Sequence, residues 1–262
     1  MTILDKILAQ KVLEVAERKQ LKSISDLEKE PLFSRKCISL KNNLMNSFVA
    51  GIISEFKRKS PSKGWIHPDA DVLEITRGYC DAGAVGISVL TDYPFFGGSP
   101  ADLTAARRVV SCPILRKDFV IDEYQLYEAK AMGADVVLLI AAALTPDKTK
   151  NLARQAQNLG LEVLLEVHNR EELDCANEFV DLLGVNNRNL KTFEVNTETS
   201  KELASYIPDD FVKVSESGLS SVETVLELRK YGYKGFLMGE HFMKEHNPAV
   251  ALKNFIDHLD IK

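Results

Sequence analysis

Short apolar runs alternate with longer amphipathic segments along the chain. The runs are rich in Val, Ile and Leu, and several lack the polar alternation of a strand with one face in water. Such runs are typical of strands buried on both faces, as in a parallel sheet. We therefore predict eight strands, at residues 48–53, 84–90, 113–115, 135–141, 162–167, 182–185, 212–214 and 235–238.

The amphipathic segments between these runs have the spacing of helices. Asp122, Thr145 and Ser220 stand at three of the expected helix starts, where side-chain oxygens cap free backbone N–H groups. Glycines end four helices just before a strand, as αβ turns require: Gly83, Gly133, Gly160 and Gly232. The predicted helices cover residues 72–82, 103–109, 122–132, 145–159, 170–177, 196–206 and 221–231.

Eight strands alternating with helices over about 250 residues fit an α/β protein of the (β/α)₈ type, a TIM barrel. A doubly wound open sheet is the alternative, but it usually has fewer strands, and no G-x-G-x-x-G follows the first strand here. Residues 1–47 precede that strand and contain two helical stretches, 2–19 and 23–29. We expect one domain over residues 1–262, with an N-terminal helical extension packed over one barrel mouth.

The composition limits which binding partners, metal sites and cellular locations we expect for this protein. The chain has 262 residues, 45% of them hydrophobic and 27% charged, and its net charge of -5 gives no reason to expect nucleic acid or an acidic membrane. The four cysteines are scattered without a C-x-x-C pair, so a zinc site or redox motif is not indicated. Neither a signal peptide nor a membrane-spanning run is visible. We expect reduced thiols and a cytoplasmic location.

Charged residues gather where the predicted strands end. In a (β/α)₈ barrel the active site lies at the C-terminal ends of the strands. Glu55 and Lys57 are two residues apart and so point the same way. Together with Lys117, Glu166 and Glu216 they would form one rim of lysines and glutamates. Such groups shift each other's pKa values and suit general acid–base chemistry.

The same rim has features of an anion site and of an apolar wall. The turns after strands seven and eight often bind phosphate through backbone N–H groups. Ser60 and Arg188 could add side-chain donors. The turns contain Ser217, Gly218 and Gly239. The wall would consist of Phe96, Phe119, Leu138 and Ile140. A ligand with an aromatic ring at one end and a phosphate at the other would fit.

Seven motifs stand at the predicted strands, in order: SEFKRKSPSKG (54–64), LTDYPFFGGS (90–99), PILRKDF (113–119), LLEVH (164–168), GVNNRNL (184–190), VSESGL (214–219) and FLMGE (236–240). Together they resemble the indole-3-glycerol-phosphate synthase family. This resemblance implies an enzyme of tryptophan biosynthesis, a carboxy-lyase, that converts 1-(2-carboxyphenylamino)-1-deoxyribulose 5-phosphate to indole-3-glycerol phosphate, carbon dioxide and water. It implies no metal or cofactor, and a monofunctional chain.

The resemblance also implies roles for four catalytic positions. Lys117 matches the general acid that protonates the ribulose carbonyl oxygen during ring closure. Glu166 matches a carboxylate of the dehydration step, as base or as stabiliser of positive charge on the anilino nitrogen. Glu55 pairs with the lysines and positions substrate hydroxyls. Lys57 lies near the substrate carboxylate and could be a second proton donor.

The remaining matched positions are implied to bind substrate. Asn186 and Glu216 hold the sugar chain, and Ser60 and Pro61 lie on a loop that closes the site. Glu240 departs from the small hydroxyl residue that many members have, so we expect its side chain to turn away from the phosphate. The phosphate-side and ring-side positions are Arg188, Ser217, Gly218, Gly239, Phe96, Phe119, Leu138, Ile140 and Leu237.

Two other functions stay open at this point. A phosphosugar isomerase or Schiff-base aldolase uses the same fold, and a phosphate-binding protein without activity could keep it. Lys117, Glu166 and Asn186 argue against loss of activity. We expect a monomer, because no exposed apolar stripe is evident in the sequence.

Overall fold

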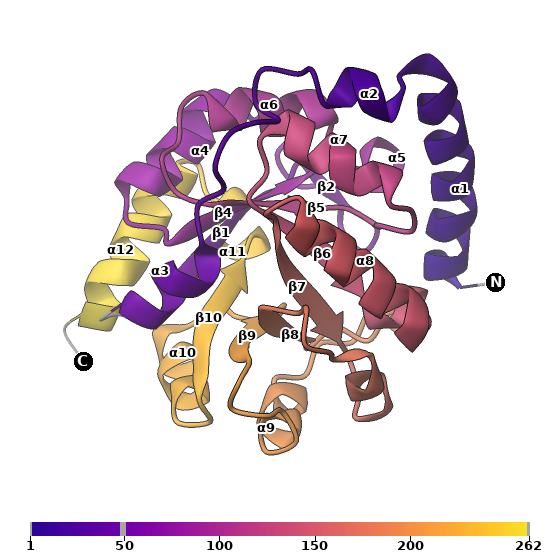
Figure 1. Cartoon of the computed structure of the whole chain (residues 1–262). Coiled ribbons are helices and arrows are strands. Elements are labelled where there is room, and N and C mark those ends of the chain that lie inside the picture. The colour runs from indigo at the N-terminus through magenta and orange to yellow at the C-terminus, as the bar shows by residue number, and fades with distance from the viewer. Residues whose placement is uncertain (1, 48–50, 261–262) are drawn as a thin grey trace.

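The computed structural model describes residues 2–47 and 51–260, and at its centre eight parallel strands close into a barrel (Figure 1). Neighbouring strands follow chain order, and the last strand pairs with the first, Gly51 opposite Gly235. The predicted (β/α)₈ fold is therefore confirmed, and the open-sheet alternative is wrong. The strands are β1 (Gly51–Phe56), β4 (Gly86–Leu90), β5 (Ile114–Lys117), β6 (Val136–Ile140), β7 (Glu162–Val167), β8 (Leu182–Asn186), β9 (Val212–Glu216) and β10 (Tyr233–Met238).

Several strands continue further than predicted, and this matters for the site. β1 includes Glu55, while residues 48–50 of the predicted first strand lie outside the described residues. β5, β8 and β9 likewise extend to Lys117, Asn186 and Glu216. These four polar residues lie beyond the apolar runs from which the strands were predicted, yet they belong to the strands themselves. Their backbones are therefore fixed by the ladder hydrogen bonds of the barrel.

Helices ring the barrel on its outer side (Figure 1). The predicted helix at 170–177 is wrong: the chain forms only a short 3₁₀ turn, η2 (Glu171–Cys175), because Asn177 bonds to Cys175 O and Phe179 N and ends it. Ser221, not Ser220, caps α10 through Thr224 N. The main helices are α4 (Val72–Asp81), α6 (Pro100–Arg107), α7 (Tyr124–Met132), α8 (Pro146–Asn158), α9 (Glu198–Ala204), α10 (Val222–Arg229) and α12 (Pro248–Asp260).

Shorter elements lie in the connections after the strands. They include α5 (Tyr93–Phe96), α11 (Glu240–Met243), the 3₁₀ turn η1 (Ala141–Ala143) and the hairpin of β2 (Lys59–Ser60) with β3 (Gly64–Trp65). None of these was predicted, since elements of two to four residues have no readable period. No helix among the described residues is both long and apolar enough to cross a bilayer.

The described part of the N-terminal extension forms three helices. Two of them pack on the outside of the barrel, and the third lies at the N-terminal end of the strands. α1 (Ile3–Leu21) and α2 (Ile24–Leu27) lie against α7, and Tyr124 donates a hydrogen bond to Arg18 O (Figure 1). α3 (Leu40–Asn46) was not predicted. Its Leu40 and Leu44 join the inward-facing strand residues in one apolar cluster. α3 thus fills the N-terminal end of the barrel and leaves the opposite rim open for a site.

Candidate active site

A cavity of about 600 Å³ lies at the C-terminal ends of the strands. All of the site residues predicted from the sequence line it, whereas their roles stay predictions. From β1 and its loop come Glu55, Lys57, Ser60 and Pro61; from the other strands and loops come Phe96, Lys117, Phe119, Leu138, Ile140, Glu166, Asn186, Arg188, Glu216, Ser217, Gly218, Leu237 and Gly239.

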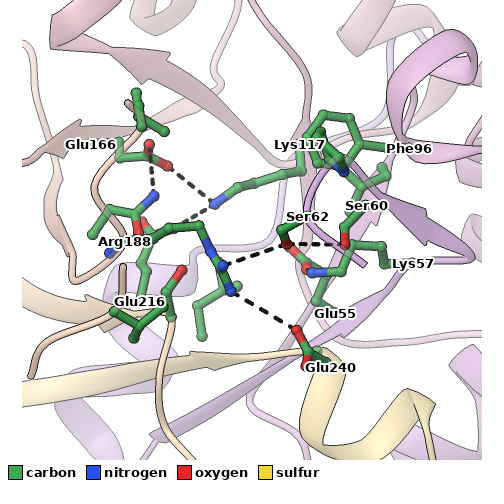
Figure 2. A pocket seen from close by; sticks show the side chains of 18 of the residues that line it. Glu55, Lys57, Ser60, Ser62, Phe96, Lys117, Glu166, Arg188, Glu216 and Glu240 are labelled. Atoms are coloured by element: carbon green, nitrogen blue, oxygen red, sulfur yellow. Dashed lines mark hydrogen bonds and ion pairs between the residues drawn. The ribbon is translucent and has the colours of Figure 1, made fainter. Parts of the chain in front are cut away.

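Lysine and glutamate side chains alternate across the cavity (Figure 2). Nζ of Lys117 lies 3.3 Å from Oε2 of Glu166 and forms a second ion pair with Oε2 of Glu216. Nζ of Lys57 lies 2.6 Å from Oε1 of Glu55. The three glutamates are buried, so their charges act through a medium that screens them less than water does.

These neighbours fix the charge on Lys117. Burial alone would lower the pKa of the Lys117 ammonium, but the carboxylates of Glu216, Glu166 and Glu55 outweigh it and raise the pKa. Burial would likewise raise the pKa of Glu166, yet Lys117, His168 and Asn186 together hold it below its usual range. The free site therefore presents a proton on Lys117 and a charged carboxylate on Glu166.

The pKa of Glu216 is shifted in the opposite direction to those of Glu55 and Glu166. Burial raises its pKa, and although Lys117 opposes this, the charges of Glu166 and Glu55 add to it. Its Oε1 is buried and has no hydrogen-bond partner among the described residues. Gly184 on β8 makes room for this oxygen, because a Cβ there would collide with it. Within the described residues Oε1 is therefore a buried acceptor without a donor, turned toward β8.

A glycine also makes room for Glu55. A methyl group added at Gly239 would lie 2.7 Å from Oε1 and 2.9 Å from Cβ of Glu55. The sequence placed Gly239 in a turn expected to bind phosphate. In the free structure its lack of a side chain already serves to seat Glu55.

The turn after β9 has the backbone of an anion site. Ser217 has φ of 65° and Gly218 has φ of 73°, and a non-glycine residue in this region is strained by about 1–3 kcal/mol. Asn187 holds the turn, with Nδ2 donating to Ser217 O at 3.0 Å and to Ser215 Oγ at 3.0 Å. Such strain is typical of turns that present backbone N–H groups to a ligand.

Arg188 stands between the β2–β3 hairpin and the start of α11 at the cavity mouth (Figure 2). Its Nη1 is 3.4 Å from Ser62 Oγ, and its Nη2 is 3.9 Å from Oε2 of Glu240. The Glu240 side chain is 38% exposed and lies toward Arg188. An anion that binds Arg188 would compete with this carboxylate.

The loop after β1 is held in place by paired side chains. Arg58 binds Asp102 with Nη1 at 2.8 Å and Nη2 at 3.0 Å, a two-point contact that fixes both residues. Ser60 Oγ accepts a hydrogen bond from Lys63 N at 3.2 Å. Ser60 and Pro61 therefore face the cavity from an ordered hairpin.

Apolar side chains cover the side of the cavity near Lys117. The rings of Phe96 and Phe119 lie with centroids 6.0 Å apart and tilted by 36°. α1 adds Ile3, Leu4 and Ile7, which the sequence prediction missed. The only sequence signal for them was the apolar start of α1, and helical spacing does not tell which partner such a face meets.

Lys11 explains how α1 is placed over this side. It is buried, with Nζ 2.8 Å from Oδ2 of Asp92 and 3.0 Å from Oδ1 of Asp118. These carboxylates follow β4 and β5 and precede Phe96 and Phe119. Lysines are almost never buried without a partner. The sequence does not show that Asp92 and Asp118 lie beside Lys11, so it does not predict the burial of this lysine.

Comparison with known proteins gives one consistent result. The family model described as Indole-3-glycerol phosphate synthase matches residues 4–255. An indole-3-glycerol phosphate synthase of Bacteroides thetaiotaomicron is 52% identical over 254 residues, covering 97% of each chain. One of Dechloromonas aromatica is 45% identical over 255 residues, covering 95% of this chain and 97% of the relative.

Similar solved structures share the fold at low identity. A mutant tryptophan synthase alpha-subunit of Pyrococcus furiosus has a TM-score of 0.61 at 18% identity, covering 82% of this chain and 100% of its own. KGPDC from Streptococcus mutans has a TM-score of 0.63 at 13% identity, covering 81% of this chain and 98% of its own. At these identities the likeness concerns the barrel alone.

Proposed function

The chain belongs to the indole-3-glycerol phosphate synthase family, and we propose that Lys117 and Glu166 perform the acid–base steps of its reaction. The reaction closes the indole ring of 1-(2-carboxyphenylamino)-1-deoxyribulose 5-phosphate and releases carbon dioxide and water, in tryptophan biosynthesis. The observation that carries the proposal is the position of Lys117 between two buried carboxylates, beside an apolar wall at the barrel rim.

Ring closure requires a proton donor at the ribulose carbonyl. As the aromatic carbon attacks, negative charge develops on the carbonyl oxygen, and the Lys117 ammonium stabilises it and delivers a proton. Glu166 and Glu216 keep Lys117 protonated until then. The rings of Phe96 and Phe119 hold the anthranilate ring over the carbonyl carbon, which contributes through orientation.

Loss of carbon dioxide then restores the aromatic ring. We place the substrate carboxylate near Lys57, whose ammonium is already paired with Glu55. Dehydration follows, and here Glu166 accepts a proton or stabilises positive charge on the anilino nitrogen. Glu55, Asn186 and Glu216 hold the sugar chain, and all three side chains line the cavity.

The phosphate is assigned to the opposite side of the cavity. The strained turn of Ser217 and Gly218 and the backbone at Gly239 supply N–H donors, with Arg188 as the cationic side chain. Ser60 and Pro61 close over the substrate from the β2–β3 hairpin. Leu138, Ile140 and Leu237 complete the apolar floor beneath the ring.

The experiment compares the wild type with Glu166→Gln, which keeps the shape and removes the charge. Turnover is followed by indole fluorescence after addition of the anilino-ribulose phosphate. We expect kcat to fall by about 10²–10⁴-fold, the usual contribution of an acid–base group. Wild-type kcat in the variant would refute the role of Glu166. A Schiff-base aldolase would be trapped on Lys117 by borohydride with substrate, and we expect no trapping, because the amine is held protonated.

We further propose that the chain acts as a monomer of one domain in the cytoplasm. The four cysteines are free thiols, which supports a reducing compartment. Sedimentation equilibrium at micromolar concentration tests the monomer, and a mass of twice 29.3 kDa would refute it.

A further inference from the structure

His168 links the Glu166 carboxylate to a second carboxylate outside the cavity. Its Nε2 lies 3.3 Å from Oε1 of Glu166, and its Nδ1 lies 3.0 Å from Oε2 of Glu172. The ring follows β7 directly and its side chain is only 10% exposed. Both ring nitrogens thus lie near carboxylate oxygens, Nδ1 in a hydrogen bond and Nε2 at ion-pair distance without an aligned hydrogen bond. A neutral imidazole has one nitrogen lone pair, which one of these carboxylates would repel, so this arrangement favours the charged ring.

Glu172 is itself held in place for this contact. Its Oε2 also accepts from His168 N at 2.8 Å, and its Oε1 accepts from Asn169 Nδ2 at 2.9 Å. Glu172 N in turn donates to Asn169 Oδ1 at 3.0 Å. The η2 turn therefore presents one oriented carboxylate to the outer nitrogen of His168. With that nitrogen occupied, the inner nitrogen lies on the side of Glu166, 3.3 Å from its Oε1.

Glu166 divides its two oxygens between the scaffold and the reacting groups. Oε1 faces His168 and accepts from Asn186 Nδ2 at 3.0 Å, while Oε2 faces Lys117 at 3.3 Å. In the proposed mechanism Lys117 gives up its proton during ring closure. At that moment Glu166 loses one neighbouring cation, and a cation on its other side becomes the one that keeps it ionised.

We propose that His168, oriented by Glu172, is a positioning residue that keeps the Glu166 carboxylate ionised and turned toward Lys117 through the catalytic cycle. This inference rests on the proposed role of Glu166. It also gives each buried carboxylate of the cavity, Glu55, Glu166 and Glu216, a neighbouring cation from Lys57, Lys117 and His168, although His168 is shared with Glu172. Burial alone would lower the pKa of His168, but Glu166 and Glu172 raise it to about 10, which agrees with the geometry.

The first experiment is the pH profile of His168→Gln, which keeps a donor group and removes the charge. The charged groups that face Glu166 are Lys117, His168, Glu216 and Glu55. Losing one cation raises the pKa of Glu166, so the acidic limb of kcat should move up by about one pH unit. At pH 7 Glu166 stays ionised in both proteins, and we expect kcat to fall about tenfold because the carboxylate loses its orientation, with KM changed by less than about threefold.

The second variant, Glu172→Gln, leaves the ring in place and weakens its hold on the proton. We expect near wild-type kcat at pH 6 and a decline toward the His168→Gln value as the pH rises and the ring becomes neutral. A purely structural role would not produce this pH dependence. The double variant should be no worse than His168→Gln alone. Glu171→Gln, at an exposed carboxylate of the same turn, is the matched control and should match the wild type throughout.

A third measurement is independent of activity. The Cε1–H resonance of His168, assigned by its absence in His168→Gln, should show a protonated ring in the wild type through pH 8. In Glu172→Gln the ring should titrate at lower pH. A wild-type ring that titrates near pH 6.5, or unchanged kinetics in a folded His168→Gln, would overturn the inference. If Glu166→Gln is inactive while His168→Gln is normal, this inference fails and the proposed function stands.

Discussion

The two ends of the barrel both hold buried charges, but they use them differently. At the N-terminal end Asp135 is fully paired: Oδ1 accepts from Arg35 and Ile38 N, and Oδ2 accepts from Arg107 and Ile114 N, all at 2.5–2.8 Å. At the C-terminal rim Lys117 is shared by two carboxylates, and Oε1 of Glu216 has no partner among the described residues.

Glu162 at the N-terminal end shows the same complete use of a carboxylate. It accepts from Leu40 N at 2.8 Å and Lys41 N at 3.0 Å, and it binds the hydroxyl of Ser39. These are the free N–H groups at the start of α3, so the carboxylate anchors this helix in the barrel end.

The difference between the two barrel ends shows which buried charged groups are candidates for function. A charge whose every oxygen has a fixed donor stabilises the fold and offers nothing to a ligand. A charge that is shared, shifted in pKa and open to a cavity is available for chemistry. Burial and ion pairing alone would have ranked Asp135 and Glu166 alike.

Asp135→Ala should give the largest effect on stability. It leaves Arg35 and Arg107 without their carboxylate in the barrel end, and breaking a buried pair costs about 3–5 kcal/mol. Urea unfolding measures the loss, with the exposed Asp210→Ala as control. The kcat of the folded fraction should stay within about twofold of the wild type. A tenfold drop in that kcat would contradict the view that charges at the N-terminal end serve only stability.

Two glycine substitutions, one at each end of the barrel, should separate effects on stability from effects on turnover. A methyl group at Gly51 would meet Leu44 of α3 and lie 2.8 Å from Lys234 O, whereas one at Gly239 would meet Glu55. We expect Gly51→Ala to lose about 1–3 kcal/mol of unfolding free energy with normal turnover. Gly239→Ala should lose about tenfold in kcat/KM, which is about 1.4 kcal/mol of transition-state stabilisation, because it displaces Glu55. A loss of kcat/KM in Gly51→Ala, with a loss of stability alone in Gly239→Ala, would contradict the comparison.

Glu216→Gln should have the smallest effect on stability. It removes a buried carboxylate whose pKa is raised by burial and by its acidic neighbours, so the unfolding free energy should change by less than about 1 kcal/mol or rise. KM should increase, because the amide at this position offers the substrate hydroxyl a weaker acceptor. Thermal unfolding and initial rates measure both. A stability loss comparable to that of Asp135→Ala would place Glu216 among the structural charges.

Much of this arrangement could be read from the sequence. Apolar runs with glycines such as Gly133 and Gly160 before them predicted the barrel, since αβ turns need left-handed residues there. The strand-end residues Lys117 and Glu166 then had to meet at one rim, because parallel strands bring their ends together.

Other features depend on contacts that the local pattern does not encode. Lys11 resembles the other charged residues of α1, and only its carboxylate partners Asp92 and Asp118 explain its burial. α3 is short and polar, and its position depends on Glu162, far away in the chain. His168 has no metal-ligand spacing and so received no role, although its two neighbours are both carboxylates.

The most direct test of the whole account is Lys117→Ala, with turnover and unfolding free energy measured on the same preparation. We predict a loss of at least about 100-fold in kcat. The unfolding free energy should stay within about 1 kcal/mol, since Glu216 can take a proton and Glu166 keeps His168. Turnover that persists, or that declines only in proportion to the unfolded fraction, would contradict the claim that the rim charges serve the chemistry.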